Sequence, residues 1–183
     1  MFRQAPPADL PLARSVVLVI DATIGIGRVL TRRLCLAGAS VAVVGAGHRE
    51  RGDDAAANAA FLCKELAALG LVALPYRVDV DRPETVGALP GHIAADMGPV
   101  TESVVVLAPA PAGSALAGWF REASALLSAA LPPGARHIEV TLSDGMSLKE
   151  AADCVVGQLL ADRRYRGAPP LWEREASRAH RSP

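Results

Sequence analysis

Short apolar runs alternate with stretches of helical periodicity along most of this 183-residue chain. The apolar runs predict strands over residues 15–20, 41–44, 71–78, 103–107 and 137–142. Between them, apolar residues recur at helical spacing, and glycines and prolines mark where helices begin or end. Strands that alternate with helices in this way are typical of a parallel sheet covered by helices on both faces. The pattern therefore predicts an α/β fold with a doubly wound parallel sheet in a single domain over residues 15–165.

Size and charge limit the number of domains and the kinds of partner. At this length, 51% hydrophobic and 21% charged residues predict one well-buried domain. We expect a flexible N-terminus over residues 1–14 and a loose tail, rich in Pro, Arg and Glu, over 166–183. The formal net charge is zero, so composition indicates neither nucleic acid nor an anionic membrane as a partner. No apolar run has the length of a signal peptide or membrane helix, and we expect a cytoplasmic protein.

Three cysteines are widely spaced along the chain, at Cys35, Cys63 and Cys154. Each falls inside an expected helix, and the spacing matches neither a zinc site nor a disulfide framework. We therefore expect all three to be small buried hydrophobic residues, and we expect no metal site.

The first strand leads into a glycine turn and a helix. This strand–turn–helix unit is typical of the opening of a Rossmann fold, whose glycines let the backbone approach a diphosphate at the helix N-terminus. Gly25, Ile26 and Gly27 keep the end of that motif, but Asp21 stands where its first glycine is expected. A carboxylate at this position would repel a phosphate. The two glycines have two interpretations, which are approach to a phosphate and close packing of the helix on the strand.

Further segments resemble the short-chain dehydrogenases/reductases, over about residues 14–142. The resemblance rests on LAALG at 66–70, VDVD at 78–81, PETV at 83–86 and the GPV that leads into the fourth strand at 98–107. It implies a Rossmann-like fold in which Asp79 and Val80 lie near the adenine of NADP(H). It also places the loop with His48, Arg49 and Arg51 where the family contacts the ribose, and this loop either holds a 2′-phosphate or is simply solvated.

The chain also departs from that family. Leu-Ala-Pro-Ala at 107–110 replaces the Asn-Asn-Ala-Gly that follows the family's fourth strand. The family's proton donor is the tyrosine of a Tyr-x-x-x-Lys motif, but the tyrosines here, Tyr76 and Tyr165, are followed four residues later by Val80 and Pro169. In one alignment Ser143 corresponds to the family's catalytic serine; in another, residues 146–168 correspond to its C-terminal helix and the catalytic segment is missing. Both alignments predict a degenerate, truncated member without the proton donor.

Candidate catalytic residues follow the first and fifth strands. Asp21, Ser143 and Asp144 border one crevice if the strand order is 3-2-1-4-5, because open α/β sheets bind ligands at the carboxyl ends of their strands. Asp21 can alternatively cap the first helix, and Ser143–Asp144 can form a turn. Our main hypothesis is a cofactor-independent cyclase or isomerase that acts on a small molecule in a bacterial biosynthetic pathway. The alternatives are a non-catalytic partner subunit and an NADP(H)-dependent oxidoreductase with an atypical proton donor.

The longest helical pattern covers residues 113–131 and has a broad apolar face. Its apolar residues are Leu116, Trp119, Phe120, Ala123, Leu126, Leu127 and Ala130. This face is wider than contact with one sheet requires, which predicts a homodimer built on this helix and on a helix over 147–164. We expect Ser147 and Glu150 to form a capping box at the start of the second of these helices.

Overall fold

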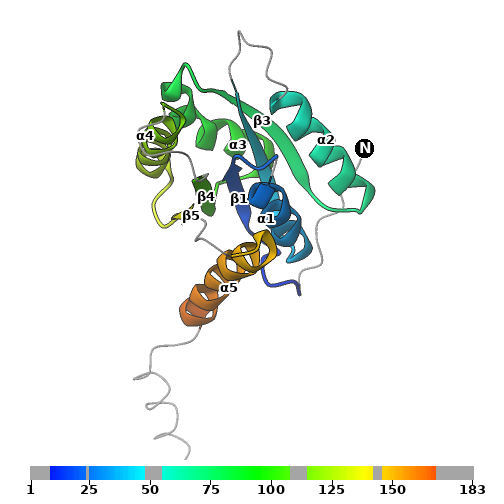
Figure 1. Ribbon diagram of the computed structural model, residues 1–183. Coiled ribbons are helices and arrows are strands. Elements are labelled where there is room, and N and C mark those ends of the chain that lie inside the picture. The colour runs from blue at the N-terminus through cyan, green and yellow to red at the C-terminus, as the bar shows by residue number, and fades with distance from the viewer. Residues whose placement is uncertain (1–8, 24, 48–54, 108–114, 142–145, 168–183) are drawn as a thin grey trace, which may run out of the picture.

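One parallel sheet forms the centre of the protein. The computed structural model describes residues 9–23, 25–47, 55–107, 115–141 and 146–167. The strands are β1 (Val16–Ile20), β2 (Ser40–Gly47), β3 (Ala73–Asp79), β4 (Glu102–Leu107) and β5 (Arg136–Thr141). Every neighbouring pair is parallel, and the order is β3-β2-β1-β4-β5 (Figure 1). The predicted doubly wound sheet and its strand order are confirmed.

Helices cover both faces of this sheet. The helical elements are α1 (Gly25–Leu36), α2 (Ala55–Ala68), the 3₁₀ helix η1 (Pro83–Ala88), α3 (Leu89–Met97), α4 (Ala115–Ala130) and α5 (Leu148–Gly167). Side chains of α1, α2 and α5 share one hydrophobic cluster with Val17 and Val19 of β1. Side chains of η1, α3 and α4 share the other with Leu18 and Ile20. Because successive side chains of a strand point to opposite faces, every residue of β1 is buried.

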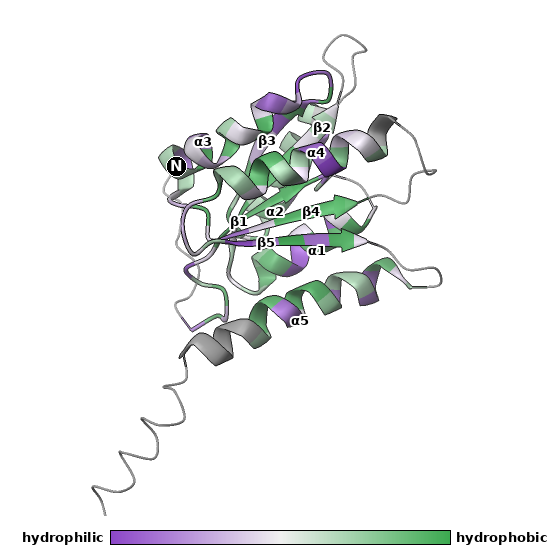
Figure 2. Ribbon diagram, turned by 90° about the vertical axis from the view of Figure 1, so that its left-hand side faces the viewer, coloured by the Kyte–Doolittle hydropathy of each residue, from purple (hydrophilic) through white to green (hydrophobic). Residues whose placement is uncertain are grey.

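The last helix, α5, lies on the same face as α1 and therefore opposite α4 (Figures 1 and 2). The predicted capping box begins it: the Glu150 N–H donates to Ser147 Oγ at 3.2 Å, and the Ser147 N–H donates to the Glu150 carboxylate at 3.0 Å. A right-handed crossover from β5 to a strand beyond it would place its helix on the α4 face. The position of α5 is thus not that of such a crossover. Within the described residues, no helix combines the length and the apolar character needed to cross a membrane.

Pro90 lies in the first turn of α3, where its missing N–H costs no hydrogen bond. Two details of the sequence prediction were wrong. Strand β2 continues to Gly47, because β3 pairs with it as far as Asp79. Cys154 is exposed, whereas Cys35 and Cys63 are buried as expected.

The argument that predicted a dimer on α4 was also wrong. Trp119 and Phe120 are only 6% and 4% exposed in the single chain, and Ala123 and Leu127 are fully buried. They are buried because α4 packs on η1 and α3 as well as on β4, so the part of the apolar face that these four residues form is already covered. In addition, α4 and α5 lie on opposite faces of the sheet and do not form one continuous surface.

Candidate functional site

Asp21 directly follows the central strand β1 and has a left-handed backbone, with a φ of 60°. Glycine adopts this conformation without strain, so the turn keeps the backbone of the expected glycine although the side chain has changed. The side chain is half-buried, and burial raises the pKa of its carboxyl above the ordinary value of 3.8. No hydrogen bond joins this carboxyl to a described residue, and the helix-cap interpretation therefore has no support there.

Gly25 and Gly27 serve different purposes at the start of α1. A Cβ on Gly27 would lie 1.9 Å from the carbonyl oxygen of Asp21, so glycine is required for the close contact between α1 and the turn. Gly25 has a φ of +50°, and no atom lies within 4 Å of the position of its Cβ. The packing interpretation thus accounts for Gly27, while Gly25 is needed for its backbone conformation. Ile26 is buried in the core beneath them.

Asp79 and Val80 mark the carboxyl end of β3, as expected. The Val80 N–H donates to the Gly47 carbonyl at 3.2 Å, and the Asp79 carboxylate accepts the Asp81 N–H at 3.1 Å. A cavity of about 320 Å³ beside them is lined by Arg77, Asp79, Arg82 and Thr85. The Asp79 side chain therefore stabilises its own turn at the edge of a cavity with two basic side chains.

The strand order spreads the candidate residues across the sheet. Asp21 follows the central strand, and Asp79 ends a strand two positions away, about 10 Å along the sheet at the usual strand spacing. On the other side β5 ends at Thr141, also two positions from β1. Ser143 and Asp144 follow Thr141 but lie outside the described residues, as do His48, Arg49 and Arg51. Among the candidates that the structure describes, Asp21 is thus the nearest to the switch point between β1 and β4.

A chain of polar side chains that the sequence reading did not identify connects β4, β5 and α4. Ser103 Oγ lies 2.7 Å from His137 Nδ1, and Ser124 Oγ lies 2.6 Å from His137 Nε2. Ser124 also donates to the Glu139 carboxylate, so its oxygen accepts from His137 Nε2–H, and Nδ1 accepts the Ser103 proton. Burial lowers the pKa of His137, while the nearby Glu139 acts in the opposite direction.

These hydrogen-bonded side chains do not form a site for external substrates. Ser103 and Ser124 are 0% and 1% exposed, and the hydroxyls serve to fix α4 on the sheet. The available signal was Ser103, a polar residue in the strand predicted over 103–107, which is otherwise apolar.

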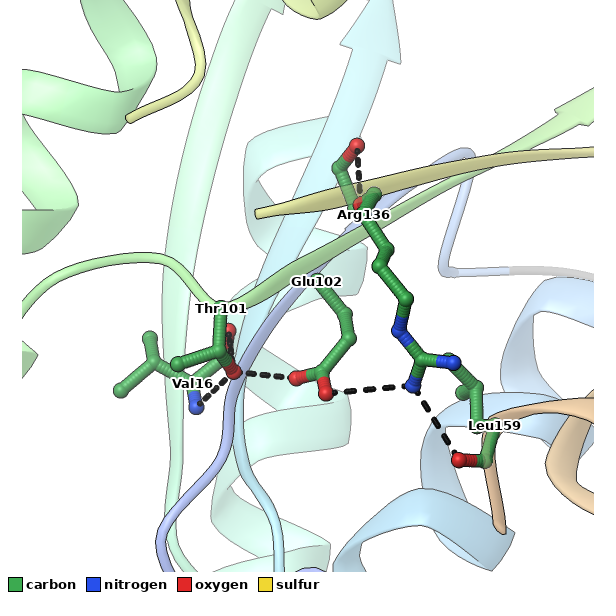
Figure 3. Close-up of polar contacts among 6 residues, drawn as sticks. Val16, Thr101, Glu102, Arg136 and Leu159 are labelled. Atoms are coloured by element: carbon green, nitrogen blue, oxygen red, sulfur yellow. Dashed lines mark hydrogen bonds and ion pairs between the residues drawn. The ribbon is translucent and has the colours of Figure 1, made fainter. Parts of the chain in front are cut away.

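A second polar cluster lies at the amino ends of β4 and β5 (Figure 3). The Arg136 guanidinium donates to Glu102 at 3.3 Å and to the Leu159 carbonyl of α5 at 3.1 Å, and Thr101 donates to the other Glu102 oxygen. Glu102 is 3% exposed. A cavity of about 420 Å³ beside the cluster is lined by the loop before β5 and the start of β4. This end of the sheet is opposite the ends at which open α/β folds bind ligands.

The described residues do not fit a nicotinamide dinucleotide well. The turn after β1 has the backbone of the expected glycine, but it carries the half-buried Asp21 carboxyl at the position of the first glycine of the diphosphate-binding motif. In its ionised form this carboxyl would repel the phosphates of such a cofactor, so we derive no hydride transfer from this site.

Comparison with known proteins bears on the fold. No protein-family model matches the chain, and no curated protein does. Among solved structures, a short-chain dehydrogenase/reductase of Serratia marcescens is 18% identical with a TM-score of 0.57, over 81% of this chain and 66% of that one. A hydroxysteroid dehydrogenase from Escherichia coli is 22% identical with a TM-score of 0.56, over 81% and 66%. A metagenomic short-chain oxidoreductase solved with NADP is 16% identical with a TM-score of 0.57, over 82% and 92%.

This chain has the short-chain dehydrogenase/reductase fold. The resemblance drawn from LAALG, VDVD and PETV predicted that fold, and the structure confirms it. The chain spans 66% of the length of the Serratia and Escherichia proteins, which is just under two thirds.

Proposed function

We propose that this protein is a cofactor-independent enzyme that rearranges a small molecule by proton transfer, as an isomerase or a cyclase does. The observation that carries the proposal is the half-buried Asp21, which follows the central strand beside the switch point. Burial raises the pKa of its carboxyl. A raised pKa brings a carboxyl toward the range in which it can both donate and accept a proton near neutral pH. Ser143 and Asp144 follow β5 and would supply polar contacts from the other side of the crevice.

The proton balance of such a reaction is closed without a redox partner. The Asp21 carboxyl donates its proton to one atom of the substrate, and a carboxylate, Asp21 or Asp144, removes a proton from another. Bonds move within the substrate. When Asp21 also removes the second proton, the enzyme returns to its starting protonation state at once; when Asp144 removes it, Asp144 must release its proton to water and Asp21 must take one up before the next turnover. The absence of a Tyr-x-x-x-Lys motif from the sequence is consistent with this chemistry. The position of α5 on the α1 face favours the alignment with the family's C-terminal helix over that with its catalytic helix.

An NADP(H)-dependent oxidoreductase is the second candidate. It is favoured by the fold shared with the metagenomic oxidoreductase solved with NADP, and with a blue fluorescent protein from a metagenomic library solved with NADPH, which is 23% identical with a TM-score of 0.52. Calorimetric titration of the full chain with NADPH and with NADH separates the two candidates. We expect no dissociation constant at or below about 1 μM, which corresponds to about −8 kcal/mol. Micromolar binding by the wild type would overturn the proposal in favour of the reductase.

Two variants test the role of Asp21 further. Asp21→Gly restores the expected glycine and should increase any residual affinity for NADPH, whereas the exposed Glu84→Gln should leave it unchanged. For catalysis, a panel of small carbonyl compounds is incubated with the protein in D₂O, and deuterium incorporation is followed by NMR. Loss of an acid–base group typically lowers rates by about 10²–10⁴-fold, and we expect Asp21→Asn to do so. Wild-type rates in Asp21→Asn and Ser143→Ala would dismiss these roles, and no exchange with any compound would favour the non-catalytic partner subunit.

A further inference from the structure

Strand β5 forms one edge of the sheet. Among the residues that the structure describes, no strand pairs with its outer side. Figure 2 shows β5 in front, with α4 above it and α5 below it. Its side chains are half-buried or exposed except for Val140, whereas those of the neighbouring β4 are buried except for Leu107. An edge of this kind offers free N–H and C=O groups to another strand.

The backbone of β5 shows which residues offer these groups. The Arg136 N–H donates to the Thr101 carbonyl at 3.0 Å, and the Arg136 carbonyl faces Ser103 Oγ at 3.5 Å. The backbone of Arg136 therefore faces β4. Because the direction alternates along a strand, Ile138 and Val140 also face β4, and the N–H and C=O groups of His137, Glu139 and Thr141 face outward.

We propose that a second copy of this chain docks on this edge, with the two β5 strands antiparallel about a two-fold axis through Ile138. Two identical edges related by a two-fold axis can pair only in antiparallel orientation. Residues with outward backbone groups must also face one another, because hydrogen-bonded pairs exchange both of their bonds. This condition places the axis on a residue rather than between two residues.

Charge and the extent of pairing select Ile138 from the possible axis positions. An axis through Arg136 or Glu139 would place that residue opposite its own copy, and like charges directly opposite are destabilising. An axis through His137 would leave Glu139, Val140 and Thr141 without a partner inside β5. An axis through Val140 would leave Arg136, His137 and Ile138, half of the strand, without a partner inside β5. With the axis on Ile138, His137 lies opposite Glu139 of the partner subunit, and Arg136 lies opposite the partner's Val140. Residues 136–140 of β5 are then paired with one another, and no two like charges face each other.

The same geometry brings together the two ends of β5. Met146 and Leu148 lie near the carboxyl end of the strand, where Met146 and Thr141 line a common cavity, and they are 42% and 41% exposed. The antiparallel arrangement directs them toward the partner's amino end, where Pro132, Pro133 and Gly134 line the cavity of about 420 Å³. Stable interfaces bury about 1,200–2,000 Å² in total, more than one strand pair supplies. These contacts, made twice by symmetry, would add the missing apolar area.

The mass of the full chain in solution tests the proposal, measured by light scattering after size exclusion at tens of micromolar. We expect a dimer for the wild type. Glu139→Pro removes an outward N–H while leaving the bonds to β4, and edge strands tolerate proline at such positions. It should give a monomer, whereas Glu139→Ala, which keeps the N–H, should remain a dimer. A monomeric wild type, or a dimer that Glu139→Pro leaves intact, would refute the β5 interface.

Cross-linking tests the register and does not depend on the proline variant being folded. In a Cys154→Ser background, Ile138→Cys places two thiols on a non-hydrogen-bonded pair whose Cα atoms are about 4.5 Å apart, within disulfide range. In the matched variant Glu139→Cys, the two thiols are diagonal, at about 7–8 Å, and should not link. Linking by Glu139→Cys and not by Ile138→Cys would overturn the assigned axis.

Discussion

The pH dependence of stability at Asp21 can be tested with two substitutions. Asp21→Asn removes the charge but keeps a residue that tolerates the left-handed backbone, and Asp21→Gly removes both the charge and the strain. Burial raises the pKa of the folded-state carboxyl above 3.8, so the folded protein holds this proton to a higher pH than the unfolded chain does. Relative to both variants, the stability of the wild type should therefore fall as the pH rises from about 3.8 through the folded-state pKa, and stay constant above it.

The backbone contribution can be estimated separately. A left-handed non-glycine residue costs roughly 1–2 kcal/mol, with Asp at the lower end. Glycine costs roughly 0.5–1 kcal/mol in conformational entropy. These terms nearly cancel, so below pH 4 we expect Asp21→Gly to be within about 1 kcal/mol of the wild type, or roughly 2–4 °C in Tm for a chain of this size. Above the folded-state pKa, both variants should be more stable than the wild type.

Urea unfolding between pH 3.5 and pH 8, monitored by circular dichroism, measures these differences. The quantity of interest is the difference in unfolding free energy between the wild type and Asp21→Asn. A change of about 1.4 kcal/mol in this difference across the pH range corresponds to a pKa shift of one unit between the folded and unfolded states. The difference in unfolding free energy between Asp21→Gly and Asp21→Asn should not vary with pH, because neither variant has a titrating group at this position. If the wild type instead gains stability over Asp21→Asn as the pH rises, the carboxylate is stabilised in the fold, and its assignment as a proton donor near neutral pH is refuted.

Two further predictions concern packing and buried charge. Gly27→Ala should destabilise the fold by several kcal/mol, because its Cβ would meet the Asp21 carbonyl oxygen at 1.9 Å. In the control Gly157→Ala, no atom lies within 4 Å of the added Cβ, and α5 should become more stable by roughly 0.5–1 kcal/mol. Equal unfolding midpoints for the two variants would contradict the close contact at Gly27. Glu102→Ala should destabilise the fold by about 3–5 kcal/mol because it leaves the Arg136 guanidinium, whose side chain is only 13% exposed, without its carboxylate. Glu84→Ala breaks an exposed pair with Arg82 at the same 3.3 Å and should destabilise the fold by less than about 1 kcal/mol. Comparable losses in urea unfolding would show that burial does not control the strength of these pairs.

The sequence was sufficient to predict the sheet because the strands alternate with helices and β1 and β4 are almost continuously apolar. It also located Asp21 in the turn after β1, although the left-handed φ and the burial of its carboxyl became apparent only in the structure. The apolar face of α4 was identified correctly, but its partners were not. Those partners, η1 and α3, reach α4 through the crossover between β3 and β4, which periodicity does not reveal. The hydrogen-bonded side chains around His137 were missed because Ser103 and His137 are 34 residues apart in the sequence.

The two polar clusters explain how the outer part of the sheet holds its helices. Arg136 and His137 are consecutive in β5, so their side chains point to opposite faces of the sheet. Arg136 binds the Leu159 carbonyl of α5 on one face, and His137 binds Ser124 of α4 on the other. Around β1, by contrast, large apolar clusters cover both faces. Two adjacent residues of the edge strand thus bind one helix each, and these contacts help to hold β5 in its extended conformation. A pre-organised edge loses little conformational entropy when it pairs, and this favours a second strand on β5 over an edge that must first become ordered.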